Sequence, residues 1–183
     1  MRKRMRWILP LCIAMHSSVG AYGQQGASSN PGAGEWGKRA SLVEEVSEHA
    51  VAELNGKIYV IAGNTNNGGT VATVQVYDVA TDRWTLTNPL PIAVNHNMAA
   101  AANGKLYSFG GQTASATSSP FTDAVYEYDP ATGQWSARAP MPTRRSAGAT
   151  AVISGKIYVA GGRPPQGHDF AVYDPATDAW TRL

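Results

Sequence analysis

Three tryptophans in this sequence are each followed, at one constant spacing, by the glycine of an Asn-Gly or Ser-Gly pair. The pairs are Trp36 with Gly56, Trp84 with Gly104, and Trp135 with Gly155, and the differences 56−36, 104−84 and 155−135 are equal. A fourth tryptophan, Trp180, closes a Tyr-Asp…Trp motif with the same offset from Asp174 as in the two motifs before it. Offsets that stay fixed while the surrounding residues change indicate a repeated unit of about 50 residues rather than an ordinary single-core domain.

Each unit predicts four short strands. The first is small and apolar and ends at the glycine turn, in the ranges His49–Leu54, Met98–Ala102 and Gly148–Ile153. Asn-Gly is typical of a two-residue hairpin turn whose central residues both have positive φ. The second strands, KIYVIAG, KLYSFGG and KIYVAGG, are apolar runs that suit burial on both faces. VQVYD, VYEYD and AVYD supply a third strand, and the tryptophan opens a fourth that ends at a proline pair.

One loop in each unit varies in length while the frame around it does not. Gly63, Gly111 and Gly162 each lie at the same offset after the turn glycine (63−56, 111−104 and 162−155). From these glycines to the tyrosine of the Tyr-Asp pair the separations differ: 77−63 = 14, 128−111 = 17 and 173−162 = 11. Binding specificity is usually found in such variable loops on a constant scaffold.

Four antiparallel strands per repeat of this length predict an all-β fold made of β-propeller blades. The recurring order of Trp, Met-Pro, Arg, Asn-Gly-Lys-Ile-Tyr-Val, Gly-Gly, Tyr-Asp-Pro and Trp resembles the kelch repeat, and it covers about three repeats from Trp36 to Leu183. Propellers close with about 4–8 blades. We therefore expect the ring to be incomplete in this chain, as the N-terminal part of a larger propeller. The alternative is a half-propeller that self-associates to close its ring.

Residues 1–23 have the pattern of a secretory signal peptide. A basic start precedes the short apolar run Trp7–Met15, and small residues lead to a predicted cleavage point between Gly20 and Gln24. The run is too short to span a bilayer, so no transmembrane anchor is expected in the mature part. Residues 24–34 predict a flexible linker, and residues 35–183 form the propeller segment. The predicted location is secreted or periplasmic.

Removal of this peptide changes the charge and the cysteine content. Four of the 15 basic residues are removed with the peptide, which leaves 11 basic and 13 acidic residues and a net charge of −2. This charge does not imply a nucleic-acid partner. Cys12, the only cysteine, leaves as well. The copper site of the galactose oxidases, which some kelch-like propellers resemble, uses a Tyr–Cys cross-link and is therefore disfavoured.

Neither a nucleophile motif nor a metal-binding spacing is present. Gly-x-Ser-x-Gly and Gly-Lys-Ser/Thr do not occur. His49, His96 and His168 form no His-x-His or Glu-x-x-His pair, so we expect no metal and no cofactor.

Residues that recur once per unit are predicted to be structural. Periodic aromatic side chains are expected to fill the space between neighbouring blades, and Asp78, Asp129 and Asp174 are expected to cap turns. The predicted structural repeat residues are Trp84, Trp135, Trp180, Gly63, Gly111, Gly162, Tyr77, Tyr128 and Tyr173.

Residues that break the repeat are the candidates for binding. Arg163 follows a glycine pair where the other units have Asn64 and Gln112, and Arg145 follows its tryptophan at an offset where the others have valine. The kelch resemblance implies that both loops lie on one ligand-binding face, where arginines suit a carboxylate. The predicted ligand-binding residues are Arg144, Arg145, Arg163, His168, Asn64 and Gln112. Alternatively, Arg145 is a framework residue that pairs with a neighbouring loop.

These features favour a binding scaffold whose variable loops contact a protein, peptide or glycan. Such a scaffold needs no catalytic residues, and the sequence offers none. The alternative is a carbohydrate-active propeller similar to the periplasmic sialic-acid mutarotases, for which Arg145 and Arg163 would be the polar pore residues. A third interpretation is a spacer within a larger surface protein.

Overall fold

A computed structural model describes residues 36–113, 121–164 and 169–183. The chain divides into two compact units, Met1–Gly37 and Lys38–Leu183. The predicted signal peptide and linker lie outside the described residues. Of the first unit only Trp36 and Gly37 are described, and they belong to no strand. Among the described residues, Trp36 therefore does not open the predicted fourth strand.

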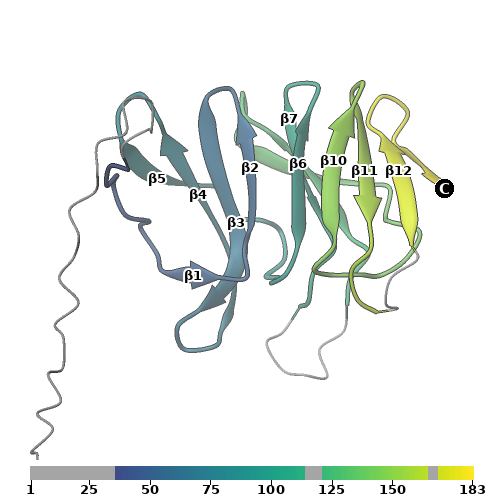
Figure 1. Ribbon diagram of the computed structural model, residues 1–183, viewed down its shortest axis with the longest axis horizontal. Helices are drawn as coiled ribbons and strands as arrows, with labels where there is room; N and C mark the ends of the chain where they lie inside the picture. Colours follow the sequence, from purple (N-terminus) through teal and green to yellow (C-terminus); the bar gives the residue numbers. More distant parts are fainter. Residues whose placement is uncertain (1–35, 114–120, 165–168) are drawn as a thin grey trace, which may run out of the picture. The chain divides into compact units, whose positions relative to one another are not determined.

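The second unit is all β, as predicted, and its strands form three antiparallel blades (Figure 1). Blade 1 contains β2 (Ala50–Leu54), β3 (Lys57–Thr65), β4 (Thr70–Asp78) and β5 (Arg83–Thr87). Blade 2 contains β6 (Met98–Ala102), β7 (Lys105–Phe109), β8 (Val125–Asp129) and β9 (Gln134–Arg138). Blade 3 contains β10 (Ala149–Ile153), β11 (Lys156–Ala160), β12 (Phe170–Asp174) and β13 (Ala179–Arg182). An additional short strand, β1 (Val46–Ser47), pairs with the far end of β3.

The first hairpin of every blade has the predicted two-residue turn. Asn55 and Gly56 have φ of 54° and 73°, and the corresponding pairs in blades 2 and 3 have 52° and 75°, and 51° and 76°. Positive φ at both central positions gives the twist that a tight antiparallel hairpin requires. The last hairpin of each blade lies at the same end, and there Asp78, Asp129 and Asp174 accept a hydrogen bond from the backbone N–H two residues later, at 2.9–3.0 Å.

Two apolar cores lie between the blades. The first joins blades 1 and 2 and includes Tyr59 and Ile61 from one side and Leu106 and Tyr128 from the other. The second joins blades 2 and 3 and consists of Met98, Ala100, Ala102, Tyr107, Phe109, Val125, Met141, Ile157, Val159 and Tyr173, with Trp180 packed against them. Each core is thus built from faces of two successive repeats, so a single repeat does not enclose a core of its own.

The repeat tryptophans link each blade to the segment before it. The indole N–H of Trp84, Trp135 and Trp180 donates to the carbonyl of Ala40, Asn88 and Ala139, at 2.9, 3.0 and 2.9 Å. The last two acceptors each lie four residues after the preceding tryptophan, and Ala40 stands at the same offset from Trp36. One sequence spacing therefore produces the same inter-repeat hydrogen bond three times.

A second link joins the repeat tyrosine to an aspartate in the following turn. In blade 3, Asp178 Oδ1 accepts from the Tyr173 hydroxyl at 2.6 Å and from the Ala139 N–H at 2.8 Å. Asp82 makes the equivalent pair of contacts in blade 1, with the Tyr77 hydroxyl and the Ala40 N–H. Blade 2 has Gly133 at this position, and there the Asn88 side chain donates to the Gly133 carbonyl at 2.7 Å.

Replacing Asp178 by alanine is expected to lower the free energy of unfolding by about 1–2 kcal/mol at neutral pH, because two donors lose their acceptor. The Tyr173 hydrogen bond lowers the pKa of Asp178, with burial opposing it. A depressed folded pKa means that the contribution is present above the unfolded value, near 3.9, and is lost as the pH falls through the folded pKa. Urea unfolding at pH 7 and at pH 3 measures both effects.

Thr177→Ala, in the same turn, is the control. It should leave the free energy of unfolding unchanged at both pH 7 and pH 3. If Asp178→Ala lowers the free energy of unfolding equally at pH 7 and pH 3, the loss does not come from the ionised carboxylate.

Blade 3 leaves uncovered the face that blades 1 and 2 bury. Phe170 and Ile153 are 42% and 58% exposed, whereas their counterparts in blade 2, Val125 and Ala102, are 1% and 6% exposed. A shallow apolar hollow of about 290 Å³ lies on this face of blade 3. On the opposite side of the unit, blade 1 is held to the segment before it by Gln75, whose buried amide exchanges two 2.9 Å hydrogen bonds with the Glu44 backbone.

Candidate binding face

The segments that vary between repeats meet at one end of the blades. At that end β1 pairs with β3 in blade 1, and single bridges join Asn95 to Gln112 in blade 2 and Ser146 to Arg163 in blade 3. We call this end the loop face; it comprises Ser47, Glu48, Asn64, Thr70, Asn95, His96, Gln112, Ser146, Ala147 and Arg163. Asn64, Gln112 and Arg163, three of the predicted binding residues, thus occupy equivalent positions there.

A chain of backbone hydrogen bonds runs across the loop face from blade to blade. The His96 N–H donates to the Glu48 carbonyl, and the Ala147 N–H donates to the His96 carbonyl, each at 2.7 Å. The φ angles at Glu48, His96 and Ala147 are 54°, 52° and 53°. Because alanine adopts this conformation in the third repeat, the backbone geometry belongs to the repeat, and only the side chain changes.

The glycine at the second position of each Ala-Gly or Gly-Gly pair allows this close approach. The Gly63 and Gly111 N–H groups donate to carbonyls of the segment that leads into the next blade, Val94 at 2.8 Å and Arg145 at 2.9 Å. Their φ angles are 114° and 111°, and a Cβ on Gly63 would lie 2.5 Å from the Ser47 carbonyl oxygen. Gly162 has φ of 98°, and a Cβ there would lie 2.6 Å from the Ser146 carbonyl oxygen. A side chain at any of the three would displace the backbone.

Replacing Ala147 by glycine is expected to raise the free energy of unfolding by about 1 kcal/mol, because glycine adopts positive φ without the steric cost that a Cβ carries. The backbone hydrogen bond to His96 is retained. Thermal or urea unfolding measures the change. Ala149→Gly, in the extended strand β10, is the matched control and should destabilise by about 0.5–1 kcal/mol. If both variants change the free energy of unfolding in the same direction, the gain at Ala147 is not due to its positive φ.

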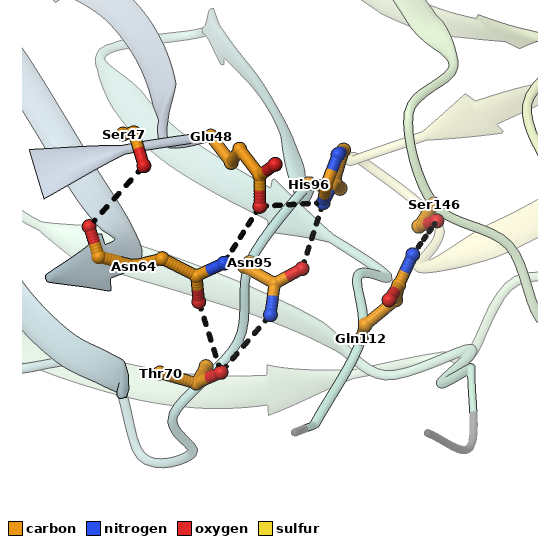
Figure 2. A network of polar contacts seen from close by, with 8 residues as sticks. All are labelled: Ser47, Glu48, Asn64, Thr70, Asn95, His96, Gln112 and Ser146. Carbon is orange, nitrogen blue, oxygen red and sulfur yellow. Dashed lines mark hydrogen bonds and ion pairs between the residues drawn. The ribbon is translucent and has the colours of Figure 1, made fainter. Parts of the chain in front are cut away.

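The side chains between blades 1 and 2 form a closed ring of polar contacts (Figure 2). Asn64 Nδ2 donates to Glu48 Oε2 at 2.6 Å, and the Thr70 hydroxyl donates to Asn64 Oδ1 at 3.0 Å. Asn95 Nδ2 donates to Thr70 Oγ1 at 3.0 Å, and Asn95 Oδ1 lies 2.7 Å from His96 Nδ1. His96 Nδ1 also lies 3.3 Å from Glu48 Oε2, which closes the ring. Such a network holds each side chain in one orientation.

Between blades 2 and 3 the loop face carries a simpler contact. Gln112 Nε2 donates to the Ser146 hydroxyl at 3.3 Å (Figure 2). The predicted residue Gln112 therefore bridges two blades, whereas the Asn64 side chain contacts Glu48 and Thr70 on its own blade.

Arg145 lies inside the fold rather than on the loop face. Its side chain is 3% exposed, and its Nη2 lies 3.6 Å from Asp169 Oδ2. The guanidinium donates twice to Thr143 Oγ1 and once each to the carbonyls of Gly161 and Asp169, at 2.6–3.3 Å. Burial lowers its pKa, and Asp169 opposes that effect, so the group stays charged. These are the contacts of a framework residue, the alternative considered from sequence.

The other predicted cations are placed differently. Arg144 is 69% exposed on its side chain and lies 3.8 Å from Asp123 Oδ2, a weak surface pair. Arg163 is exposed, and its backbone exchanges two 2.9 Å hydrogen bonds with Ser146. The backbone thus brings Arg163 beside Arg145, but one guanidinium faces solvent and the other is buried. His168 lies outside the described residues.

Two residues of the ring, Glu48 and His96, were missed from sequence. Each follows a tryptophan at the same offset, because 48−36 equals 96−84, so they occupy the same position of successive repeats. His49, the other histidine of this region, differs from that position by one residue. Aligning position by position from the tryptophans would have identified the pair. Thr70 and Asn95 complete the ring through contacts that no spacing indicates.

Within the described residues, no group of three or more His, Cys, Asp or Glu side chains is placed to hold a metal ion. The same part of the chain contains no helix long and apolar enough to cross a membrane.

Comparison with known proteins agrees with the blade architecture. The profile of the KLHDC2/KLHL20/DRC7 Kelch-repeats domain matches residues 37–183. The chain belongs to the kelch-repeat family. The solved structure of YjhT is similar to this kelch chain with a TM-score of 0.62 at 20% identity, over 75% of this chain and 51% of that one. At that identity the likeness concerns the fold alone.

Curated kelch proteins are similar over most of this chain but are much longer. Kelch-like protein terF of Aspergillus terreus is 34% identical over 152 residues, which cover 74% of this chain and 33% of that protein. Kelch-like protein 35 of Mus musculus is 29% identical over 151 residues, 81% of this chain and 25% of that protein. The kelch chain therefore spans about a third or less of the length of these relatives.

Proposed function

We propose that this kelch chain is a binding scaffold whose loop face contacts a protein partner. The observation that carries the proposal is the constant backbone and changing side chain at equivalent positions of that face. Glu48, His96 and Ala147 have nearly equal φ angles (54°, 52° and 53°), yet they are an acid, an imidazole and a methyl group. A rigid frame that presents different side chains from repeat to repeat is suited to recognising an extended, non-repetitive surface.

Site-specific cross-linking tests the proposal. A photoreactive amino acid is placed in the full chain at Gln112 or Arg163 on the loop face, or at Val79 or Ser154 at the opposite, turn end of the blades. The expected result is a defined cross-linked protein from the native source with the loop-face positions only. Arg163→Glu should then weaken capture through Gln112. Equal cross-linking from both ends, or none from the loop face, contradicts the proposal.

The contacts of Arg145 favour a protein rather than a sugar as the ligand. The carbohydrate-active alternative used Arg145 and Arg163 together, but the Arg145 guanidinium is occupied by Thr143, Gly161 and Asp169. A sugar bound at the loop face would contact Arg163 without a second free guanidinium from Arg145. The scaffold proposal needs no such pair of free cations and is therefore the better supported.

We also propose that the protein is exported to the periplasm or beyond. The basis is the basic, apolar and small-residue order of residues 1–23. Expression of the full gene product, followed by fractionation and N-terminal sequencing, tests this. The expected mature N-terminus falls between Ala21 and Gln24, and an intact Met1 on cytoplasmic protein contradicts it.

A further inference from the structure

The carboxylate of Glu48 fixes the orientation of two groups in its ring. An ionised carboxylate only accepts hydrogen bonds, so the Asn64 atom 2.6 Å from Glu48 Oε2 is the Nδ2 donor. Asn64 Oδ1 therefore faces Thr70, whose hydroxyl donates to it at 3.0 Å. A hydroxyl has one proton, and here that proton is used, so the next contact of Thr70 Oγ1 must be one that it accepts.

This order continues to His96. Thr70 Oγ1 accepts from Asn95 Nδ2 at 3.0 Å, which turns Asn95 Oδ1 toward the imidazole. His96 Nδ1 then lies between two acceptors, Asn95 Oδ1 at 2.7 Å and Glu48 Oε2 at 3.3 Å. A ring nitrogen between two acceptors carries a proton, and in the neutral imidazole the lone pair is then on the other nitrogen. The ring of contacts assigns His96 the Nδ1–H tautomer.

At Glu48 and His96 the atoms left over for a ligand are acceptors. His96 Nε2 is on the edge of the imidazole opposite the contact with Asn95 (Figure 2), and it makes no hydrogen bond to the described residues. The side chains of Glu48 and His96 are 43% and 23% exposed. An anionic ligand would face a carboxylate and a lone pair, whereas a cationic donor would satisfy both. The chemistry of this spot therefore selects for positive charge.

An open hollow lies along the segment that leads to Glu48 and offers room for the stem of such a side chain. It has a volume of about 500 Å³ and is lined by Ser41, Leu42, Glu45, Val46, Ser47 and Asn66. Leu42 and Val46 supply apolar surface, on which the methylenes of lysine or arginine pack while the charged end reaches a polar group. Between Arg39 and Lys57 the chain carries four glutamates and no lysine or arginine, so no nearby cation on this segment competes for the site.

We propose that Glu48 and His96 form a subsite for a lysine or arginine side chain of the protein partner. Glu48 supplies the anionic contact, and His96 Nε2 supplies a neutral acceptor held in place by Asn95. This inference rests on the proposed binding function, because it names the chemistry that the loop face recognises at blades 1 and 2.

NMR on the full chain with ¹⁵N-labelled histidine tests both parts of the inference. Long-range ¹H–¹⁵N correlation at a pH where His96 is neutral should show Nδ1 protonated and Nε2 bearing the lone pair. The probe is Nα-acetyl-lysine methylamide, and its uncharged counterpart is the norleucine analogue. We expect the lysine compound to shift the His96 Nε2 resonance and the norleucine compound to leave it unchanged.

Two variants separate recognition from folding. Glu48→Gln removes the charge and should weaken the lysine probe about tenfold. Thr70→Val removes the hydroxyl that orders the ring, so His96 should show a mixture of tautomers. Glu53→Gln is the matched control: it makes the same change on β2 at the turn end, where Glu53 Oε1 accepts from the Gly56 N–H at 2.7 Å, and it should leave probe binding unchanged.

Each result decides the inference. An Nε2–H tautomer in the parent protein, an equal response to lysine and norleucine probes, or full binding by Glu48→Gln overturns it. If Thr70→Val does not fold, the tautomer of the parent protein and the Glu48→Gln titration still decide. Loop-face cross-linking at Gln112 and Arg163 without any lysine response would leave the scaffold function standing and reject the cationic subsite.

Discussion

Arg145→Met is expected to lower the free energy of unfolding by about 3 kcal/mol. Methionine keeps the length and packing of the aliphatic stem but removes the charge and all five guanidinium N–H donors. Asp169 Oδ2 is buried and lies 3.6 Å from Arg145, so the carboxylate would stay in place without this counter-charge. The carbonyls of Gly161 and Asp169 would also lose a donor. Equilibrium urea unfolding of the full chain measures the change.

Two companion variants identify the cause. Asp169→Asn combined with Arg145→Met should recover part of the loss, because the uncompensated charge is gone. Arg145→Lys keeps the charge but not the planar fork, so its effect should fall between those of the parent protein and Arg145→Met. An unchanged unfolding midpoint for Arg145→Met, together with loss of partner capture at the loop face, would assign Arg145 to the ligand instead of the framework.

The sequence identified Arg145 as unusual but could not predict its role. Its departure from the valine of the other repeats marked the position, but two interpretations remained open. The deciding contacts come from Gly161 and Asp169, which are 16 and 24 residues away. Whether a charged side chain turns inward depends on acceptors that the fold brings to it, and spacing within the repeat does not encode their positions.

The blades were predictable because they depend on local signals that recur. Hairpin turns need positive φ at fixed positions, and the inter-blade indole bonds need only a constant offset along the chain. The hairpin between β3 and β4 was not predicted, because its polar sequence was interpreted as a loop. In the structure the Thr65 N–H donates to the Gly69 carbonyl at 2.9 Å, a tight turn that lets both strands extend to nine residues.

The ring around Glu48 was predictable from sequence only in part. Glu48 and His96 share a repeat position that counting from the tryptophans reveals, but Thr70 reaches the ring only because β4 is extended. An expectation drawn from the repeat finds the positions that face a ligand. It does not find the side chains from the extended hairpin that orient them.

Gly110→Ala is expected to destabilise the protein by at least about 3 kcal/mol, more than its backbone conformation alone would require. Gly110 has φ of +58°, and an added Cβ would lie 2.2 Å from the Arg145 carbonyl oxygen and 2.7 Å from Met141 Cε. A left-handed alanine costs about 1–2 kcal/mol, and displacing packed neighbours adds a similar amount. The carbonyl of Arg145 cannot move freely, because it accepts the Gly111 N–H at 2.9 Å.

Gly161→Ala is a matched control at the same position of the next repeat. Gly161 has φ of +64°, and a Cβ there would meet nothing within 4 Å. It should therefore cost only the conformational part, about 1–2 kcal/mol. Ala62 occupies this position in blade 1 with φ of 62°, so the repeat accepts alanine where the neighbours leave space. The difference between the two variants in urea unfolding then measures the contact of Arg145 and Met141 with Gly110, and equal effects would show that this contact is not tight.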